Sequence, residues 1–283
     1  MSTHTGGYYL PEPSYWPIVG SLALFCGALG ATLMIHDMIG GGWLLAAGGA
    51  ALAVMLFGWF GKVIQESQSG LHNPQVDLSF RWGMGWFIFS EVMFFAAFFG
   101  ALFYGRAIAV PDLAGGEQLR LLWPGYAGGW PTAGPGVQSP FTPMAPWGIP
   151  ALNTLLLMSS GVTVTWAHWA LKKNRRGQLK LGLALTVALG LTFLGFQAYE
   201  YHHAYTEMGL TLGAGIYGAT FFMLTGFHGL HVSIGTLMLM VILGRSLAGH
   251  FKPDRHFAFE AVSWYWHFVD VVWLLLFFFV YWL

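Results

Sequence analysis

The sequence predicts an all-α integral membrane protein that crosses the bilayer seven times. Of its 283 residues, 56% are hydrophobic and only 8% are charged, whereas about 25% of the residues are charged in an ordinary soluble domain. So few polar groups cannot cover a water-soluble globule, and lipid must therefore serve as much of the solvent. Seven long apolar stretches and an uneven distribution of Lys and Arg between the connecting segments indicate the same class.

Each apolar stretch is long enough to cross the hydrocarbon core, which takes roughly 20 residues of helix. Only a helix satisfies all of its backbone donors and acceptors within one segment in lipid, so each stretch is predicted to be helical. Trp and Tyr recur at the ends, as amphipathic rings do at the level of the headgroups. The predicted spans are Trp16–Ile35, Trp43–Ile64, Phe80–Tyr104, Ile149–Leu171, Leu179–Tyr201, Tyr217–Leu243 and Phe257–Trp282.

The basic residues predict an N-terminus inside and a C-terminus outside. With this orientation, ten of the 12 Lys and Arg residues lie on the inner side, and only Arg106 and Arg120 lie outside. An excess of Lys and Arg in short loops marks the inner side of a membrane protein. The inner residues are Lys62, Arg81, Lys172, Lys173, Arg175, Arg176, Lys180, Arg245, Lys252 and Arg255.

We expect a single membrane domain over residues 1–283, with helices one and two at about 16–64 and helices three to seven at about 80–282. The connections are short apart from the outer loop at 105–148, which is rich in Gly and Pro. Such a composition favours turns and irregular backbone over helix. Loops of this length are usually functional or disordered.

Composition and motifs argue against several function classes. The 12 basic and 12 acidic residues balance, so nothing indicates a nucleic-acid partner. Cys26 is the only cysteine, and the chain can therefore form neither an internal disulfide nor a cysteine metal site. The first fifteen residues contain no Lys or Arg and are not expected to be a signal or transit peptide. The sequence holds no Walker loop, dinucleotide fingerprint, nucleophile elbow or zinc motif.

Ionisable residues at membrane depth are costly, and here they form what we call the polar seam. Its members occupy predicted helices three, six and seven: Glu91, His228, His231, His267 and Asp270. One hypothesis is a metal or haem site, with His228 and His267 clamping a haem from facing helices. The alternative is that the side chains bond to one another or to backbone carbonyls and lock the helices together. We favour the second, because no helix shows the recurrent ligand spacing of a cofactor bundle.

Glu91 has no cation near it in the sequence. It could be a protonated carboxyl that donates a hydrogen bond, because burial disfavours the charged form. It could equally contact a lipid headgroup or handle protons. Both interpretations stay open at this point.

A second polar group lies at the predicted inner boundary and comprises Trp59, Lys62, Glu66, His72, Arg81 and Arg245. Such residues usually anchor a protein at the interface. They could instead form a pocket for phospholipid headgroups, in which Arg and Lys meet phosphate. At the outer end of the fifth helix, Glu200, His202 and His203 are expected to be hydrated.

From about Tyr15 to the C-terminus, the chain resembles subunit III of the haem–copper cytochrome c oxidases. Matching stretches follow one another in order across five helices, which is more specific than any one short motif. They include Arg81-Trp82-Gly83-Met84, Ser90-Glu91-Val92-Met93-Phe94-Phe95, Ser160-Gly161-Val162-Thr163-Val164-Thr165-Trp166-Ala167-His168, Thr225-Gly226-Phe227-His228-Gly229-Leu230-His231 and Trp264-Tyr265-Trp266-His267-Phe268-Val269-Asp270. The chain departs from the pattern at Trp59-Phe60, where the family often has paired tryptophans, and at extra residues around Asp112–Gly128.

The resemblance implies a non-redox structural subunit of a proton-pumping cytochrome c oxidase of the aerobic respiratory chain. Helices one and two would splay from helices three to seven around a cleft filled by phospholipid. No haem or copper would bind in this chain, since both belong to subunits I and II, and cytochrome c would be the electron donor to the complex. The subunit would stabilise subunit I and support proton uptake from the inner side. By position, Glu91 matches a buried glutamate of the family, and Trp59, Glu66, His72 and Arg245 match positions associated with lipid headgroups.

Two rivals are a close relative, the equivalent subunit of a quinol oxidase, and a protein of another class, a multipass transporter or channel. The equivalent subunit of a quinol oxidase generally has five helices, so the first two spans here argue against it. A multipass transporter would need broken helices or a polar lining along a pathway, whereas the polar seam is short. The Gly- and Ala-rich composition favours the inner (plasma) membrane of a bacterium over that of a mitochondrion.

Overall fold

The computed structural model describes residues 9–116, 121–137 and 141–283, and within these ranges it holds helices and loops but no strand. In the described part of the chain, seven helices are long and apolar enough to cross a membrane, which confirms the predicted all-α membrane fold. The chain divides into two compact units, Met1–Phe80 and Arg81–Leu283, and each is considered by itself.

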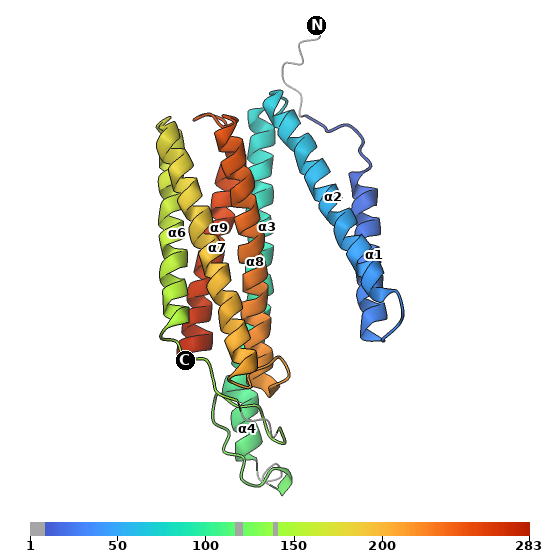
Figure 1. Ribbon diagram of the computed structural model, residues 1–283, viewed down its shortest axis with the longest axis vertical. Coiled ribbons are helices and arrows are strands. Elements are labelled where there is room, and N and C mark those ends of the chain that lie inside the picture. Colours follow the sequence, from blue (N-terminus) through green and yellow to red (C-terminus); the bar gives the residue numbers. More distant parts are fainter. Residues whose placement is uncertain (1–8, 117–120, 138–140) are drawn as a thin grey trace. The chain divides into compact units, whose positions relative to one another are not determined.

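The first unit is a hairpin of α1 (Trp16–Ile35) and α2 (Gly41–Gln68) (Figure 1). The turn between them contains Asp37 and Gly40, both with positive φ. Glycines let the two backbones approach closely, as small residues do in membrane helix pairs. A Cβ on Gly30 would lie 2.4 Å from the Leu45 backbone nitrogen, and one on Gly48 would lie 2.6 Å from the Gly27 nitrogen.

The second unit is built on α6 (Ile149–Lys172), α7 (Arg176–Thr206), α8 (Gly215–Leu247) and α9 (Phe257–Leu276), which η2 (Phe277–Trp282) extends. In sequence order, each of these four helices contacts the next, and α6 also contacts α9. The longest, α8, has 33 residues and therefore reaches past the hydrocarbon core. The helix α3 (Pro74–Phe103) begins in the first unit and contributes its main length to the second.

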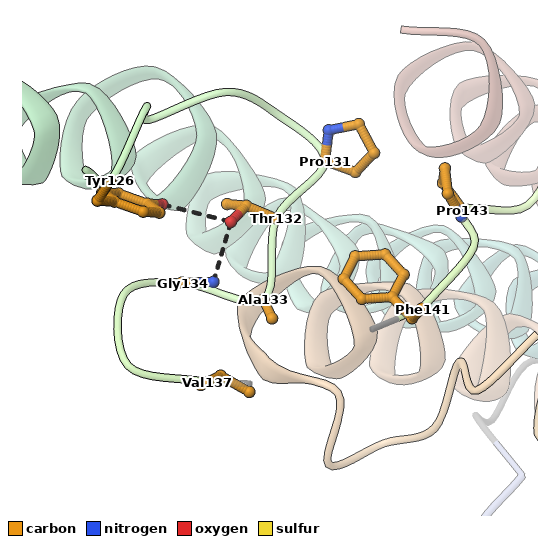
Figure 2. Close-up of a pocket in the computed structure, with 8 residues that line it drawn as sticks. All are labelled: Tyr126, Pro131, Thr132, Ala133, Gly134, Val137, Phe141 and Pro143. Atoms are coloured by element: carbon orange, nitrogen blue, oxygen red, sulfur yellow. Dashed lines mark hydrogen bonds between the residues drawn. The ribbon is translucent and has the colours of Figure 1, made fainter. Parts of the chain in front are cut away.

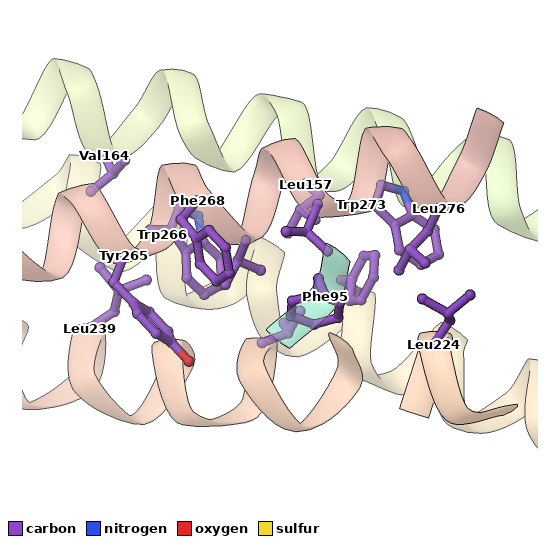
Figure 3. Close-up of a cluster of buried hydrophobic side chains, with 14 of the residues drawn as sticks. Phe95, Leu157, Val164, Leu224, Leu239, Tyr265, Trp266, Phe268, Trp273 and Leu276 are labelled. Atoms are coloured by element: carbon purple, nitrogen blue, oxygen red, sulfur yellow. The ribbon is translucent and has the colours of Figure 1, made fainter. Parts of the chain in front are cut away.

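The core of the second unit centres on two tryptophans of α9, Trp266 and Trp273, which are fully buried (Figure 3). Their indole nitrogens donate hydrogen bonds to α6, from Trp266 to Ser160 Oγ at 2.8 Å and from Trp273 to Thr154 Oγ1 at 2.9 Å. A buried indole needs a partner for its N–H group. These two bonds therefore fix the position of α9 against α6.

The outer loop departs from the prediction of irregular backbone after Gly105. The helix continues through η1 (Tyr104–Ala109) and α4 (Val110–Gly115). Val110 is buried, and Pro111, which has no backbone N–H group to donate, lies two residues after the end of the π-helical segment. The helix ends where Gly116 adopts an extended conformation. Residues 117–120 of the Asp112–Gly128 insertion lie outside the described residues.

Thr132 and Ala133 of the outer loop lie at the start of α8 (Figure 2). The first backbone N–H groups of a helix lack partners within the helix. Here the carbonyls of Ala133 and Thr132 accept from Ile216 and Tyr217, each at 3.2 Å. The loop itself is fixed at Thr132, whose hydroxyl oxygen accepts from the Gly134 N–H at 3.1 Å.

The orientation of the helices remains a prediction that rests on the basic residues. A reporter fused after Leu283 should lie outside, and one inserted within 172–176 should lie inside, because Lys and Arg are retained on the inner side. Protease protection and membrane-impermeant labelling of intact cells would measure both. The reversed pattern would show that the positive-inside assignment fails for this chain.

Candidate functional site

The polar seam lies in the second unit, where Glu91 of α3 meets His231 of α8. His231 Nδ1 lies 2.6 Å from the Phe227 carbonyl, which can only accept, so Nδ1 carries a proton. The other ring nitrogen, Nε2, lies 2.9 Å from Glu91 Oε2. In a neutral ring this Nε2 holds a lone pair, and a carboxylate offers only lone pairs. The pair therefore shares a proton, which resides on the carboxyl or on the imidazole.

The second pair of the polar seam, His267 and Asp270, joins α9 to α6. Thr165 donates to the Gly161 carbonyl at 2.9 Å, so its hydroxyl oxygen is left to accept from His267 Nε2 at 3.1 Å. The remaining ring nitrogen, His267 Nδ1, lies 3.3 Å from Asp270 Oδ2. Gly161 makes room for this carboxylate, because a Cβ there would lie 2.4 Å from Asp270 Oδ2.

His228 is buried between aromatic rings of two neighbouring helices. Its ring centroid lies 5.9 Å from that of Phe193 on α7 and 5.2 Å from that of Trp273 on α9. Its Nε2 donates to the Val269 carbonyl of α9 at 3.1 Å, and its buried Nδ1 has no partner among the described residues. Both nitrogens of His267 and one of His228 thus bond to protein groups, which is the arrangement that the helix-locking hypothesis describes.

A further polar cluster lies where α6 ends and α9 begins, and we call it the α6–α9 cluster. It comprises His168, His256, Glu260 and Arg81. The Nε2 atoms of His168 and His256 lie 3.6 and 3.3 Å from Glu260 Oε1. Arg81 forms an ion pair with the other oxygen of Glu260 at 2.5 Å. Arg81, which the sequence groups with the inner boundary residues, is thus a partner of a carboxylate in this unit.

The prediction of a hydrated Glu200 is wrong. Glu200 is only 1% exposed, and its Oε1 accepts from the Tyr281 hydroxyl at 2.6 Å and from Gln197 Nε2 at 3.4 Å. The π-helical end of the chain, η2, places Tyr281 over the carboxylate. His202 is exposed as predicted, and His203 pairs with Glu207 at 3.2 Å.

The four residues assigned to lipid headgroups are divided between the two units. Trp59 and Glu66 lie on α2, and His72 lies between α2 and α3. Trp59 is 40% exposed, and burial lowers the pKa of His72, whose ring packs on Phe80 at 5.1 Å. Arg245 belongs to the second unit, where its guanidinium lies 4.6 Å from the Phe251 ring centroid and its buried Nε has no partner among the described residues.

An apolar groove of about 800 Å³ lies along α3 and α9. Phe95, Phe99 and Phe103 line it from α3, and Phe268 and Phe279 line it from the α9 side. Arg106 also borders the groove and donates to the terminal Leu283 carbonyl at 2.5 Å. An apolar groove that is bordered by the positively charged side chain of Arg106 suits a lipid acyl chain better than a polar substrate.

The sequence identified each member of the polar seam but missed Glu200 and most of the α6–α9 cluster. One signal was available for the cluster, since His256 and Glu260 stand four residues apart and therefore share a helix face. His168 lies 88 residues before His256, and no pattern within one helix connects them.

The family model for cytochrome c oxidase subunit III matches residues 6–283. Cytochrome c oxidase subunit 3 of Marchantia polymorpha is 44% identical over 276 residues, which are 97% of this chain and 96% of that protein. The protein of the same name from Hippopotamus amphibius is 41% identical over 285 residues, or 100% and 99% of the two chains. That from Cyprinus carpio is 40% identical over 283 residues, again 100% and 99%. The chain therefore belongs to the cytochrome c oxidase subunit III family, and it is a multi-pass membrane subunit of a cytochrome c oxidase.

Proposed function

We propose that this chain is a non-redox subunit that stabilises subunit I, holds phospholipid and supports proton uptake from the inner side. Haem and copper would reside in subunits I and II, cytochrome c would donate electrons to the complex, and the complex would pump protons. Our proposal gives the chain no catalytic centre and no redox metal of its own.

The observation that carries this proposal is the bonding of the polar seam across helices. Glu91 with His231 joins α3 to α8, His228 joins α8 to α9, and His267 joins α9 to α6. In a low-dielectric interior, paired polar groups fix one arrangement of helices because an unpaired group is costly. The seam therefore supports a rigid scaffold, and the proton shared by Glu91 and His231 supports a part in proton handling.

Lipid binding is supported by the outer faces of the helices and by single side chains. In the most apolar windows of α1 and α2, only 17% and 11% of the residues are buried. The Nε of Arg245 is a buried donor without a described partner, and a phosphate oxygen would accept from it. Trp59 presents an exposed ring that can lie among acyl carbons. With its pKa lowered by burial, His72 is suited to meet a headgroup as a neutral hydrogen-bonding ring.

The test is lipid retention in the purified oxidase complex. Arg245→Ala combined with Trp59→Ala should reduce the number of tightly held phospholipids, because a phosphate partner in the second unit and an exposed ring in the first unit are both lost. Mass spectrometry would count the lipids, and the lifetime of the complex during turnover should shorten in parallel.

A matched control replaces an arginine and a tryptophan elsewhere, Arg255→Ala with Trp43→Ala, both of which are exposed. This variant should keep the native lipid count and lifetime. If the Arg245 and Trp59 variant also keeps both, these residues are interfacial anchors and the lipid proposal fails.

We further propose that the complex resides in the inner membrane of a bacterium. The support is compositional and includes 39 glycines in 283 residues. The same seven spans would serve equally well in the inner membrane of a mitochondrion. Genomic context of the coding sequence would decide between the two.

A further inference from the structure

We propose that the α6–α9 cluster binds one divalent cation of the zinc class through His168, His256 and Glu260. Among the described residues, these three side chains form a group whose ligand atoms all lie within 4.8 Å of one another. Two imidazole nitrogens and one carboxylate oxygen form a donor set that Zn²⁺ prefers. The site goes beyond the proposed function and is independent of it.

Two of the distances between the ligand atoms are close to those around a tetrahedral ion. With metal–ligand bonds of about 2.0–2.1 Å, neighbouring ligand atoms of a tetrahedron lie about 3.3 Å apart. Glu260 Oε1 lies 3.3 Å from His256 Nε2 and 3.6 Å from His168 Nε2. The ring centroids of the two histidines lie 5.3 Å apart. The ligand atoms of all three residues lie within 4.8 Å of one another, so side-chain rotations would bring them to three positions around one ion and leave the fourth to water.

The hydrogen bonds in this cluster leave nitrogen and oxygen lone pairs facing one another. His256 Nδ1 lies 3.2 Å from the Lys252 carbonyl and must donate to it, so the Nε2 of a neutral ring holds a lone pair. That lone pair faces Glu260 Oε1, which is also an acceptor. The Nε2 atoms of both histidines are buried and form no hydrogen bond with the described residues. A proton or a metal ion would satisfy these converging acceptors.

The surroundings resemble the outer shell of a metal site more than a simple ion pair. A backbone carbonyl fixes the His256 tautomer, and Arg81 holds Glu260 Oε2 so that Oε1 points at the histidines. Since Arg81 already balances the Glu260 charge, we expect reversible binding rather than the permanent binding of a structural zinc. The side chains of His168, Glu260 and His256 remain 17%, 12% and 9% exposed, which leaves room for a water ligand.

A cation bound at the α6–α9 cluster would link the end of α6 to the start of α9. Because Arg81 pairs with Glu260, the cation would also link both helices to α3. The three helices are already joined at this end by ionic contacts to Glu260. The present ionic contacts exchange readily. Coordinate bonds to a bound ion would take their place. The ligand is thus a mobile divalent cation of the surrounding solution.

The experiment uses the whole oxidase complex, stripped with a chelator and then dialysed against buffered micromolar Zn²⁺. Elemental mass spectrometry would count the zinc. The native complex should hold one more Zn²⁺ than complexes that carry His168→Ala or His256→Ala, and the double variant should lose no more than either single one. His256→Cys supplies a thiolate ligand and should restore the ion.

The matched control is His250→Ala, which removes an exposed histidine six residues before His256 and should keep the native count. Retention of this subunit and of the haem spectrum would show that each variant has assembled. For a variant that does not assemble, anomalous diffraction from native crystals soaked in Zn²⁺ should place a peak between the three side chains. Equal zinc counts in the native complex and in the His168→Ala and His256→Ala variants, or no anomalous peak, would overturn the proposal. A protonated imidazole would then be the partner of Glu260.

Discussion

Replacing Gly48 with alanine should destabilise the α1–α2 hairpin by about 1–3 kcal/mol, the usual cost of overpacking. A Cβ at this position would lie 2.6 Å from the Gly27 backbone nitrogen and 2.8 Å from the Ala23 carbonyl oxygen. Both are main-chain atoms of α1, so no side-chain rotation can relieve the contact. The helices must move apart, and the packing that joins them in lipid is then lost.

Gly49→Ala provides the matched control, because nothing lies within 4 Å of a Cβ there. Both substitutions gain the same helix propensity, up to about 1 kcal/mol per residue. The difference between their free energies of unfolding therefore isolates the contact with α1. Unfolding of the full chain by SDS in mixed micelles, followed by circular dichroism, would measure both. A stabilised or neutral Gly48→Ala would mean that the two helices do not approach as closely as the structure indicates.

The sequence was sufficient to find the seven spans because each is a long apolar run with aromatic ends. Trp16–Ile35 and Phe257–Trp282 were predicted with the bounds that the structure has. Arg176–Thr206 and Gly215–Leu247 extend past the predicted ends. Helices continue into the headgroup layer, where polar residues are tolerated and hydropathy no longer marks the boundary.

The polar residues could be identified from the sequence, but their partners could not. A charge in an apolar run is conspicuous, so Glu91 and Asp270 were found at once. The partner of Glu91 stands 140 positions away, and only the packing of α3 on α8 brings it close. Glu200 was misjudged for the same reason, since hydropathy cannot show that Tyr281 returns from the chain end to cover it.

Glu91→Ala should weaken the association of α3 with α8 by about 1–2 kcal/mol, the range measured for side-chain hydrogen bonds between membrane helices. The loss follows from the hydrogen bonding of His231, whose Nδ1 is committed to the Phe227 carbonyl at 2.6 Å. Without the carboxyl, His231 Nε2 loses its hydrogen bond to Glu91, although Phe95 and Tyr265 still pack on the ring. His231→Ala should cost a similar amount, and the double variant should cost little more than either one.

Glu91→Gln separates the scaffold role from the proton role that we propose for this pair. The amide can still bond to His231 Nε2, so helix association should remain near native, yet the amide cannot give up or take a proton at physiological pH. Proton uptake by the complex should therefore slow in Glu91→Gln as much as in Glu91→Ala. Ser90→Ala is the control, because the Ser90 hydroxyl bonds only within its own helix, to the Phe87 carbonyl at 2.7 Å. Native uptake in Glu91→Gln, with loss of stability only in Glu91→Ala, would assign the pair to holding α3 against α8 and remove it from the proton path.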